Sequence, residues 1–425
     1  MLNNRANLNL LAVSAMTGET AINTPQDLDL SLMVDVGDYL NLDVRRENNA
    51  DEADGREEPS VIYDNGATAS GQLTFNKLQP HQAGFMLAYG LGNVTTTSAG
   101  SGYLHTIIPL QGDVDLARSN PSFTAAQRVG QTINKRRLAS CFIDSITMTF
   151  AADAWVTGSA AVRATGQFTD TVTEEIVSAL DNATTLTLTA NGVQGATAQD
   201  RLDSVQVVRA VVGGGMKFAT ITGVSDASPA VLTIESLGGA GTETVEYRIL
   251  YTPIEPAWAT FPARITETPL RVAQACLYLG GTWNGTEFIG GKQLAADLTT
   301  FEYTLNNAME IEFTPCAGGS FAGRAFRGGR NQMIRINRKM RDMLLQQHMA
   351  NNEYLGLHLL CEGAEYEAGH NYTVELIFPR LGVLAAPLNT EGRLVAEAGD
   401  MQVLEDATYG SVIARVKNLV ATYAA

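Results

Sequence analysis

Histidine and cysteine are the side chains best suited to metal binding or redox chemistry, and both are scarce in this chain of 425 residues. The five histidines form no HExxH or HxH pair, the spacings that place two imidazoles on one ion. The cysteines are Cys141, Cys276, Cys316 and Cys361. They lie too far apart for a CxxC pair, and each lies in or beside an apolar stretch. We therefore expect buried thiols, no metal and no cofactor.

The motifs of nucleophilic, phosphate-binding and glycosidic sites are also missing. The sequence GGSFAG at Gly318–Gly323 has a serine with the wrong spacing for a GxSxG elbow. The run Gly213–Gly215 lacks the helix and lysine of a phosphate-binding loop. Glu310 and Glu312 lie two apart on a predicted strand and so share a face, but a glycosidase pair would also need a pocket around them. We expect no catalytic site.

The charge balance bears on possible partners. Lysine and arginine number 29 against 45 acids, a net charge of −16, which argues against a protein that grips nucleic acid or an anionic membrane. Two basic clusters, Lys135–Arg137 and Arg324–Arg341, contain a single aromatic residue, Phe326, and so lack the series of aromatic side chains on which successive bases stack. We predict that they pair with acids of a neighbouring subunit, through Arg136, Arg137, Arg330, Arg335 and Arg338. No apolar run approaches the ~20 residues that span a bilayer.

The elements that would position these residues are mostly strands. Alternation over Leu28–Val36 predicts a strand with one buried and one acidic face, and the acid-rich segment 47–60 that follows predicts a long mobile loop. Further strands are predicted at 71–78, 103–108, 143–152 and 156–168. A helix is predicted from Pro80 to Gly90 or Gly92, because proline suits a first helical position and glycine an exit.

The rest of the chain divides into two parts. Residues 174–262 consist of short strands between small polar turns, which predicts a small β-domain. Residues 263–425 return to longer strands, interrupted by a helix over about 338–352. The order of strands, one short helix and more strands thus occurs before residue 174 and again after residue 262, which indicates an internal duplication of architecture.

Several segments resemble the tail tube proteins of long-tailed bacteriophages. The resemblance lies in LNLLAVSAMTGETAINTPQDLDLSLMV, GQLTFNKLQPHQAGFMLAYGLGN and GYLHTIIP, and in the last part in GGRNQMIRINRKMRDMLLQQHMANNEYLGLHLLCEG and VLEDATYGSVIARVKNLV. It implies a β-sandwich tube domain with a flanking helix, assembled into rings whose inner strands join in a continuous barrel. The rings would stack into a tube that conducts double-stranded DNA. The resemblance also implies that the acidic loop contacts the adjacent ring, through Glu47, Asp51, Glu52, Asp54, Glu57 and Glu58.

The two outer parts are each near the size of a whole domain. We therefore expect a mainly β chain with a first tail-tube domain at 1–173, a second at 263–425, each a sandwich or barrel with a short helix, and an inserted β-domain at 174–262 on the outer surface. Three chains would then form a ring with pseudo-six-fold symmetry, whereas a single tube domain would require six chains. The expected partners are further copies, other tail proteins and DNA in transit without specific binding, in the virion tail after assembly in the host cytoplasm, with no membrane.

DNA that slides through a pore must not bind to its wall, which favours an acidic lumen. The acids that alternate with apolar residues on predicted strands are the candidates for this face: Asp27, Asp29, Asp35, Glu302, Glu310 and Glu312. Two alternatives stay open. One is a secreted glycan-binding or carbohydrate-active β-protein, which the scarcity of tryptophan disfavours, and the other is a hexameric secretion-tube protein of the related bacterial apparatus.

Overall fold

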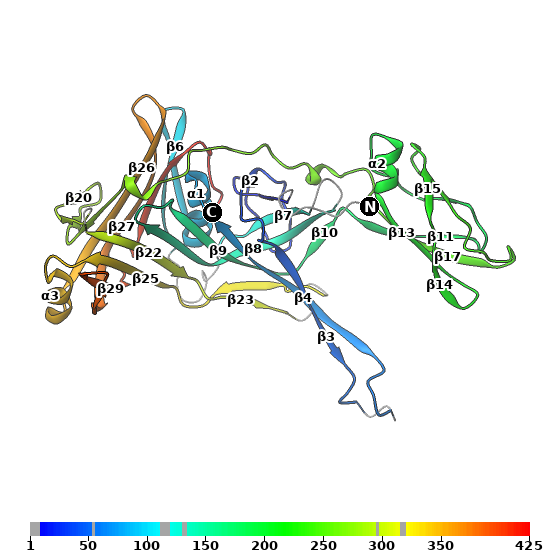
Figure 1. Cartoon of the computed structure of the whole chain (residues 1–425), viewed down its shortest axis with the longest axis horizontal. Helices are drawn as coiled ribbons and strands as arrows, with labels where there is room; N and C mark the ends of the chain where they lie inside the picture. Colours follow the sequence, from blue (N-terminus) through cyan, green and yellow to red (C-terminus); the bar gives the residue numbers. More distant parts are fainter. Residues whose placement is uncertain (1–8, 53–55, 111–119, 130–133, 295–296, 315–319) are drawn as a thin grey trace. The chain divides into compact units, whose positions relative to one another are not determined.

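The computed structural model describes residues 9–52, 56–110, 120–129, 134–294, 297–314 and 320–425, and it confirms a mainly β chain (Figure 1). The described residues form two compact units. The smaller unit lies within Met1–Leu11, Ala126–Arg137 and Phe168–Phe261, and the larger within Ala12–Ala125, Leu138–Gln167 and Pro262–Ala425. The first and last parts of the chain therefore share one unit, and each unit is described by itself below.

An antiparallel sheet of eight strands, here the main sheet, dominates the larger unit. Its order is β3-β4-β9-β8-β22-β25-β29-β28. The strands are β3 (Leu40–Asn48), β4 (Ile62–Phe75), β8 (Asn134–Ala151), β9 (Thr157–Ala164), β22 (Leu298–Asn306), β25 (Asn331–Lys339), β28 (Leu388–Glu391) and β29 (Leu394–Val403). Four strands precede the smaller unit's main segment in the chain and four follow it, and the pairing of β8 with β22 joins the two sets.

The main sheet repeats one pattern twice. The first half runs through the hairpin β3–β4, helix α1 (Pro80–Leu91), the hairpin β5 (Gly92–Ala99)–β6 (Gly102–Pro109), and then β8 and β9. The second half runs through β22–β25, helix α3 (Leu344–Asn351), the hairpin β26 (Tyr354–Glu367)–β27 (His370–Ala385), and then β28 and β29. In both halves the last strand inserts beside the first hairpin, which gives β3-β4-β9-β8 and β22-β25-β29-β28. The two halves thus have the same order of elements and the same strand pairing.

A second layer faces the main sheet. It has the order β5-β6-β30-β27-β26-β18-β21, with β30 (Ile413–Asn418), β18 (Ala275–Leu279) and β21 (Lys292–Gln293). Strand β27 also pairs with β29, so the two layers are continuous. The other short elements are β1 (Leu10–Val13), β2 (Leu30–Leu32), β7 (Phe123–Val129), β19 (Thr282–Trp283), β20 (Phe288–Ile289), β23 (Met309–Glu312), β24 (Arg324–Arg327) and the 3₁₀ turn η3 (Val272–Gln274). Strand β10 (Phe168–Asp170) and the 3₁₀ turn η2 (Ala257–Ala259) belong to the smaller unit.

Helix α1 fills the space between the layers. Pro80 occupies its first turn and Gly92, with a φ of 95°, ends it in the left-handed region, as the sequence predicts. All its residues are buried; it contacts β6 and β30 of the second layer, and at Gly90 it lies so close to Ile146 of β8 that a Cβ would clash. Helix α3 is shorter than predicted and ends at Asn352, which has a φ of 53°.

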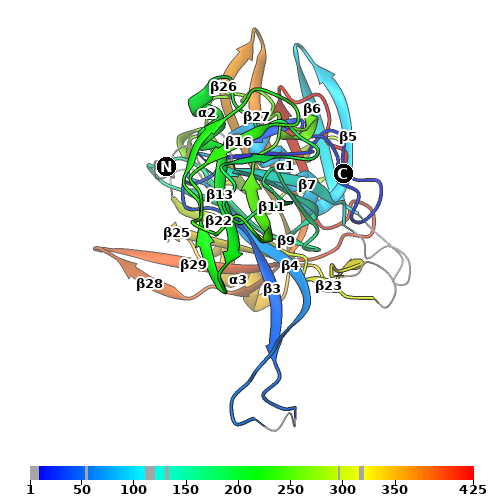
Figure 2. The same cartoon turned by 90° about the vertical axis from the view of Figure 1, so that its right-hand side faces the viewer.

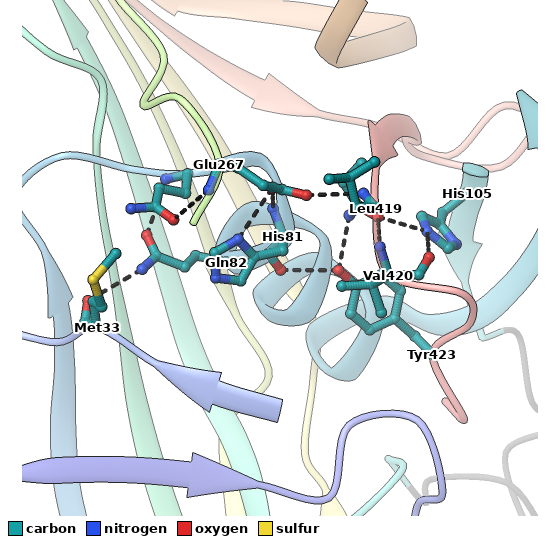
Figure 3. Close-up of polar contacts among 10 residues, drawn as sticks. Met33, His81, Gln82, His105, Glu267, Leu419, Val420 and Tyr423 are labelled. Atoms are coloured by element: carbon teal, nitrogen blue, oxygen red, sulfur yellow. Dashed lines mark hydrogen bonds and ion pairs between the residues drawn. The ribbon is translucent and has the colours of Figure 1, made fainter. Parts of the chain in front are cut away.

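A buried polar network fixes the start of α1 to the end of the chain (Figure 3). The Glu267 carboxylate, fully buried, accepts hydrogen bonds from the backbone N–H groups of His81 (2.7 Å) and Leu419 (2.8 Å). Tyr423 donates its hydroxyl proton to the His81 carbonyl at 2.9 Å. A carboxylate at a helix N-terminus satisfies free N–H groups and complements the helix dipole. The network therefore holds three distant segments on one side of the core.

The smaller unit is a β-domain with its own core. One sheet has the order β11-β17-β13-β14 and the other β12-β16-β15. Its elements are β11 (Thr173–Leu180), β12 (Thr185–Thr187), α2 (Ala198–Asp203), β13 (Val205–Val212), β14 (Gly215–Phe218), β15 (Ile221–Val224), β16 (Val231–Ile234) and β17 (Thr244–Tyr251). Residues from both sheets, among them Leu232, Tyr247 and Ile249, are fully buried in a single cluster.

Two local predictions are wrong. The strand expected over Leu28–Val36 is limited to β2, whose three residues are all buried, so no acidic face alternates along it. The acidic segment 47–60 is bounded by longer strands than expected, because β3 extends to Asn48 and β4 begins at Ile62. Pairing of Asn48 with Ile62 continues the hairpin toward its tip.

Candidate functional site

Polar residues occupy one face of the six central strands of the main sheet. Side chains alternate between the two faces of a strand, and here one face is the core, with Met148, Tyr303 and Ile334 opposite one another and buried. We name the other set the hydroxyl face: Ser70, Gln72 and Thr74 on β4; Thr157, Ser159, Ala161 and Arg163 on β9; Ser145, Thr147 and Thr149 on β8; Thr300, Glu302, Thr304 and Asn306 on β22; Asn331, Met333, Arg335 and Asn337 on β25; and Ala398, Asp400 and Gln402 on β29.

The hydroxyl face is in register across both halves of the sheet. One row of directly opposite residues crosses six strands, with serine or threonine on the first four: Thr74, Ser159, Thr147, Thr304, Met333 and Gln402. Hydroxyl and amide side chains predominate, and none of its residues is aromatic. The two acids and two arginines give a formal charge of zero. Chemically, the face presents hydrogen-bonding groups to water and no platform for stacking.

The charged residues of the hydroxyl face lie beside groups of opposite sign. Glu302, Arg335 and Asp400 are directly opposite one another on β22, β25 and β29. The Arg335 Nε donates to Asp400 Oδ1 at 2.8 Å, and this bond raises the pKa of the arginine. On the other half, Arg163 Nε lies 3.1 Å from Oδ2 of Asp144.

The outermost strands of the main sheet leave two edges open. Among the described residues, the register gives β3 the partner β4 and β28 the partner β29, with no strand beyond either. An open edge presents unpaired N–H and C=O groups and can continue a sheet into another chain. On the β29 side, β28 borders only residues 394–397, while β27 pairs with residues 400–403, so the open edge lies beside the first part of β29.

The hairpin β3–β4 extends beyond the main sheet as an arm, here residues 44–52 and 56–67 (Figure 2). Near its tip, Asn49 Oδ1 accepts from the backbone N–H groups of Ser60 and Val61 at 2.8 and 3.1 Å. At its root, Gly66 has a φ of 94°, and a Cβ there would meet Phe313. Arg45 lies over the same ring at 4.7 Å, so the segment after β23 braces the arm.

The predicted ring-contact acids lie on this arm, with one exception. Glu47, Asp51, Glu52, Glu57 and Glu58 are exposed, and Glu52 accepts a hydrogen bond from Tyr63 at 2.7 Å. Asp54 lies outside the described residues. Val61, Ile62 and Tyr63 are also exposed, so the arm carries apolar side chains beside its acids. Their contact with another ring stays a prediction.

The six acids predicted for a lumen are not on one face. Glu302 alone belongs to the hydroxyl face, whereas Glu310 and Glu312 are exposed on β23, in the separate hairpin β23–β24. Asp29 accepts four bonds from 15–17, including the Ala15 and Met16 N–H groups at 2.6 and 2.9 Å. Asp35 binds Asn76 at 2.6 Å, and Asp27 is exposed. Asp29 therefore holds a turn in its own chain.

The five arginines predicted to pair with another subunit all contact groups of their own chain. Arg136 forms a two-point pair with Asp170 at 2.7 and 2.8 Å, and Arg137 lies over the Trp258 ring. Arg330 binds the Leu91 carbonyl, and burial lowers its pKa to about 10. Arg335 is described above.

Arg338 requires a correction to the predicted role. Its side chain is fully buried and binds Glu397, also fully buried, at 2.7 Å and Asp342 at 2.9 Å. Both acids are in its own chain, so in this conformation Arg338 cannot reach a carboxylate of another subunit. It instead fixes the segment between β25 and α3.

The described thiols are buried or half-buried. Cys141 and Cys361 are buried, Cys276 is half-buried and all three are free, whereas Cys316 lies outside the described residues. Burial raises the pKa of Cys361 to about 12, so its thiol is protonated at neutral pH. Within the described ranges, no three histidine, cysteine or acidic side chains gather in a metal-binding arrangement.

Most of the hydroxyl face was not predicted from the sequence, although a local signal for part of it is present. Thr147 and Thr149 alternate with apolar residues on β8, and Thr300, Glu302 and Thr304 do so on β22. Alternation indicates that such residues share a face but does not indicate which strands lie side by side. Asp400 carries no local signal that connects it to Arg335, because 65 residues separate them.

No protein-family model and no curated protein matches the chain. In the part of the chain that the structure describes, no helix is long and apolar enough to cross a membrane.

Proposed function

We propose that the chain is the subunit of a phage tail tube. Copies join edge to edge through β3 and β28, close into a ring and stack into a tube that conducts double-stranded DNA. The observation that carries this proposal is the main sheet itself: two equivalent four-stranded halves in one register, with one continuous polar face and two open edges. Closure into a ring would pair both edges, which is the means by which barrels avoid exposed strands.

The number of strands favours three chains per ring. Three copies of an eight-stranded sheet, spaced at about 4.8 Å and tilted by about 40°, close into a barrel about 48 Å wide between backbones. Side chains reduce the lumen to about 40 Å, which admits a duplex about 20 Å wide with water around it. Six copies would give a barrel of about 95 Å, far wider than one duplex requires. The duplicated architecture therefore supports a trimer with pseudo-six-fold symmetry.

The hydroxyl face supplies the lumen lining in this proposal. Unpaired Lys and Arg side chains supply the salt-dependent part of the affinity for DNA, because each displaces counterions from phosphate. Hydroxyl and amide groups instead hold a layer of water between wall and duplex. The hydroxyl face has no net charge, whereas the sequence predicts an acidic lumen. The five predicted lumen acids other than Glu302 lie outside this face, so their exposure to the lumen stays a prediction.

The arm is the element suited to join successive rings, since it extends beyond the main sheet and its apolar side chains are exposed. Assembly of this kind would take place in the host cytoplasm, and the product would belong to the virion tail together with other tail proteins.

Negative-stain electron microscopy of the purified protein tests the proposal. We expect rings or tubes with a central hole of about 40 Å, and native mass spectrometry should give three chains per ring. A monomer that stays monodisperse over a wide range of concentration would contradict the proposal. Specific binding to a glycan array by that monomer would favour the glycan-binding alternative, although the hydroxyl face offers no aromatic ring on which sugars stack.

A further inference from the structure

Arg335 is one of the two exposed cations of the hydroxyl face, whose other polar residues are mostly hydroxyl and amide groups. Its side chain is 58% exposed, and it lies between Glu302 on one neighbouring strand and Asp400 on the other. Asp400 accepts a hydrogen bond from its Nε at 2.8 Å. The guanidinium is therefore engaged on one edge and flanked by a second carboxylate.

An unpaired arginine at this position would act against a surface that DNA must pass. The guanidinium binds phosphate through two parallel hydrogen bonds and stays charged at every physiological pH. The Asp400 carboxylate occupies the Nε donor of Arg335, and its charge repels a phosphate from the remaining donors. With one carboxylate on each side of Arg335, the row of three residues has a net negative charge. Without the two carboxylates, the same row would be positively charged.

The same arrangement occurs in the other half of the main sheet. Arg163 on β9 has a side chain that is 53% exposed, and its Nε lies 3.1 Å from Oδ2 of Asp144 on β8. Both arginines of the hydroxyl face thus have a carboxylate from an adjacent strand on their Nε edge. Exposed ion pairs contribute little to folding stability, so stability alone is a weak reason for this repetition.

We propose that Glu302 and Asp400 mask Arg335, so that this arginine ties β25 to its neighbours without offering a binding site to DNA phosphate. Asp144 does the same for Arg163. The reason for such masking rests on the proposed function. Its effect can be measured on the purified chain by itself: removal of the carboxylates converts a surface that does not bind DNA into one that does.

The test compares four proteins for binding to a fluorescent 30-base-pair duplex at 50 and 200 mM salt. They are the unmodified chain, the double variant Glu302→Gln with Asp400→Asn, the triple variant that adds Arg335→Gln, and the single variant Arg335→Gln. These changes keep side-chain size close to the original, and thermal unfolding of each protein shows whether the fold is kept. We expect the double variant to bind at least about tenfold more tightly than the unmodified chain at 50 mM salt, and this gain to fall about 3.5-fold at 200 mM for each phosphate contact formed.

The triple variant should return to the weak binding of the unmodified chain, because the freed cation is gone. Equal binding by the unmodified and double variants would overturn the masking role, and so would undiminished binding by the triple variant. Microscopy of the same samples separates the two ideas. If rings form but the double variant gains no DNA binding, the masking role is contradicted and the tube proposal is not. If the double variant gains DNA binding but no rings form, the masking role is supported and the tube proposal is contradicted.

Discussion

At the scale of residues, the environment of His105 allows a prediction about pH. Its Nε2 lies 3.0 Å from both Asn418 Oδ1 and the Val420 carbonyl, which accept hydrogen bonds, so Nε2 carries the proton. Its Nδ1 lies 2.9 Å from Thr96 Oγ1 and accepts from that hydroxyl. Burial lowers the pKa of the ring below the usual value of 6.5, which favours its neutral form.

A histidine whose pKa is lower in the folded than in the unfolded state stabilises the fold above pH ~6.5. This contribution is lost as the pH falls through the folded-state pKa, because the unfolded chain then binds more protons. We expect the melting temperature to fall between pH 7 and pH 5, and to fall less in His105→Gln. The matched control is Gln347→Ala, which changes an exposed residue of α3 without a titratable group and should keep the slope of the unmodified protein. Identical slopes in all three proteins would refute the assignment.

The same network shows where reasoning from sequence stops at this scale. Each histidine was visible as a residue type, and the absence of metal-binding spacings was readable directly. The partner of the His81 backbone, however, is Glu267, 186 residues away. No local pattern encodes such a contact, because the carboxylate becomes a helix-capping group only after the core has brought the two segments together.

At the scale of elements, alternation and turn residues predicted helix α1 and strands such as β6 and β22, because their patterns are local. The prediction of a strand over Leu28–Val36 was wrong, because it assumed alternating buried and exposed side chains, whereas all three residues of β2 are buried. Pairing was not predictable either, since the acids at 310 and 312 could belong to the main sheet or, as found, to a separate hairpin. The hydroxyl face depends on pairing and so emerged only from the structure.

Strand β28 gives the element-scale prediction. The β28–β29 turn is two residues long, so Glu391 and Leu394 share ladder hydrogen bonds, while the N–H of Thr390 points to the open edge. Thr390→Pro removes that edge donor without removing a bond of the hairpin. We expect the variant to keep the melting temperature within a few degrees and to lose ring assembly, as seen by size-exclusion chromatography and microscopy. Thr390→Val keeps the N–H and should assemble normally; rings formed by the proline variant would show that this edge is not the joint.

At the scale of the whole molecule, the order of elements in the sequence predicted two similar parts before and after the central segment. The structure adds that both parts belong to one sheet. Two separate tube domains and two halves of one sheet have the same order of elements in the sequence, and the pairing of β8 with β22 distinguishes them. The consequence concerns assembly, since a single chain already contains one junction between equivalent halves. A ring of three chains would then need only three intermolecular junctions where six separate domains would need six.

The segment between the halves leads to the last prediction. Thr173 and Tyr251 are paired across β11 and β17, so the chain enters and leaves this segment at points about 5 Å apart, and two glycines can replace residues 174–250. Neither the hydroxyl face nor the edge strands β3 and β28 lie in the removed segment. We therefore expect the shortened chain to form rings with an unchanged central hole and a lower mass per ring, measured by microscopy and native mass spectrometry. If the shortened chain keeps a cooperative melting transition but no longer forms rings, the segment itself makes contacts between subunits, and closure through the main sheet alone is refuted.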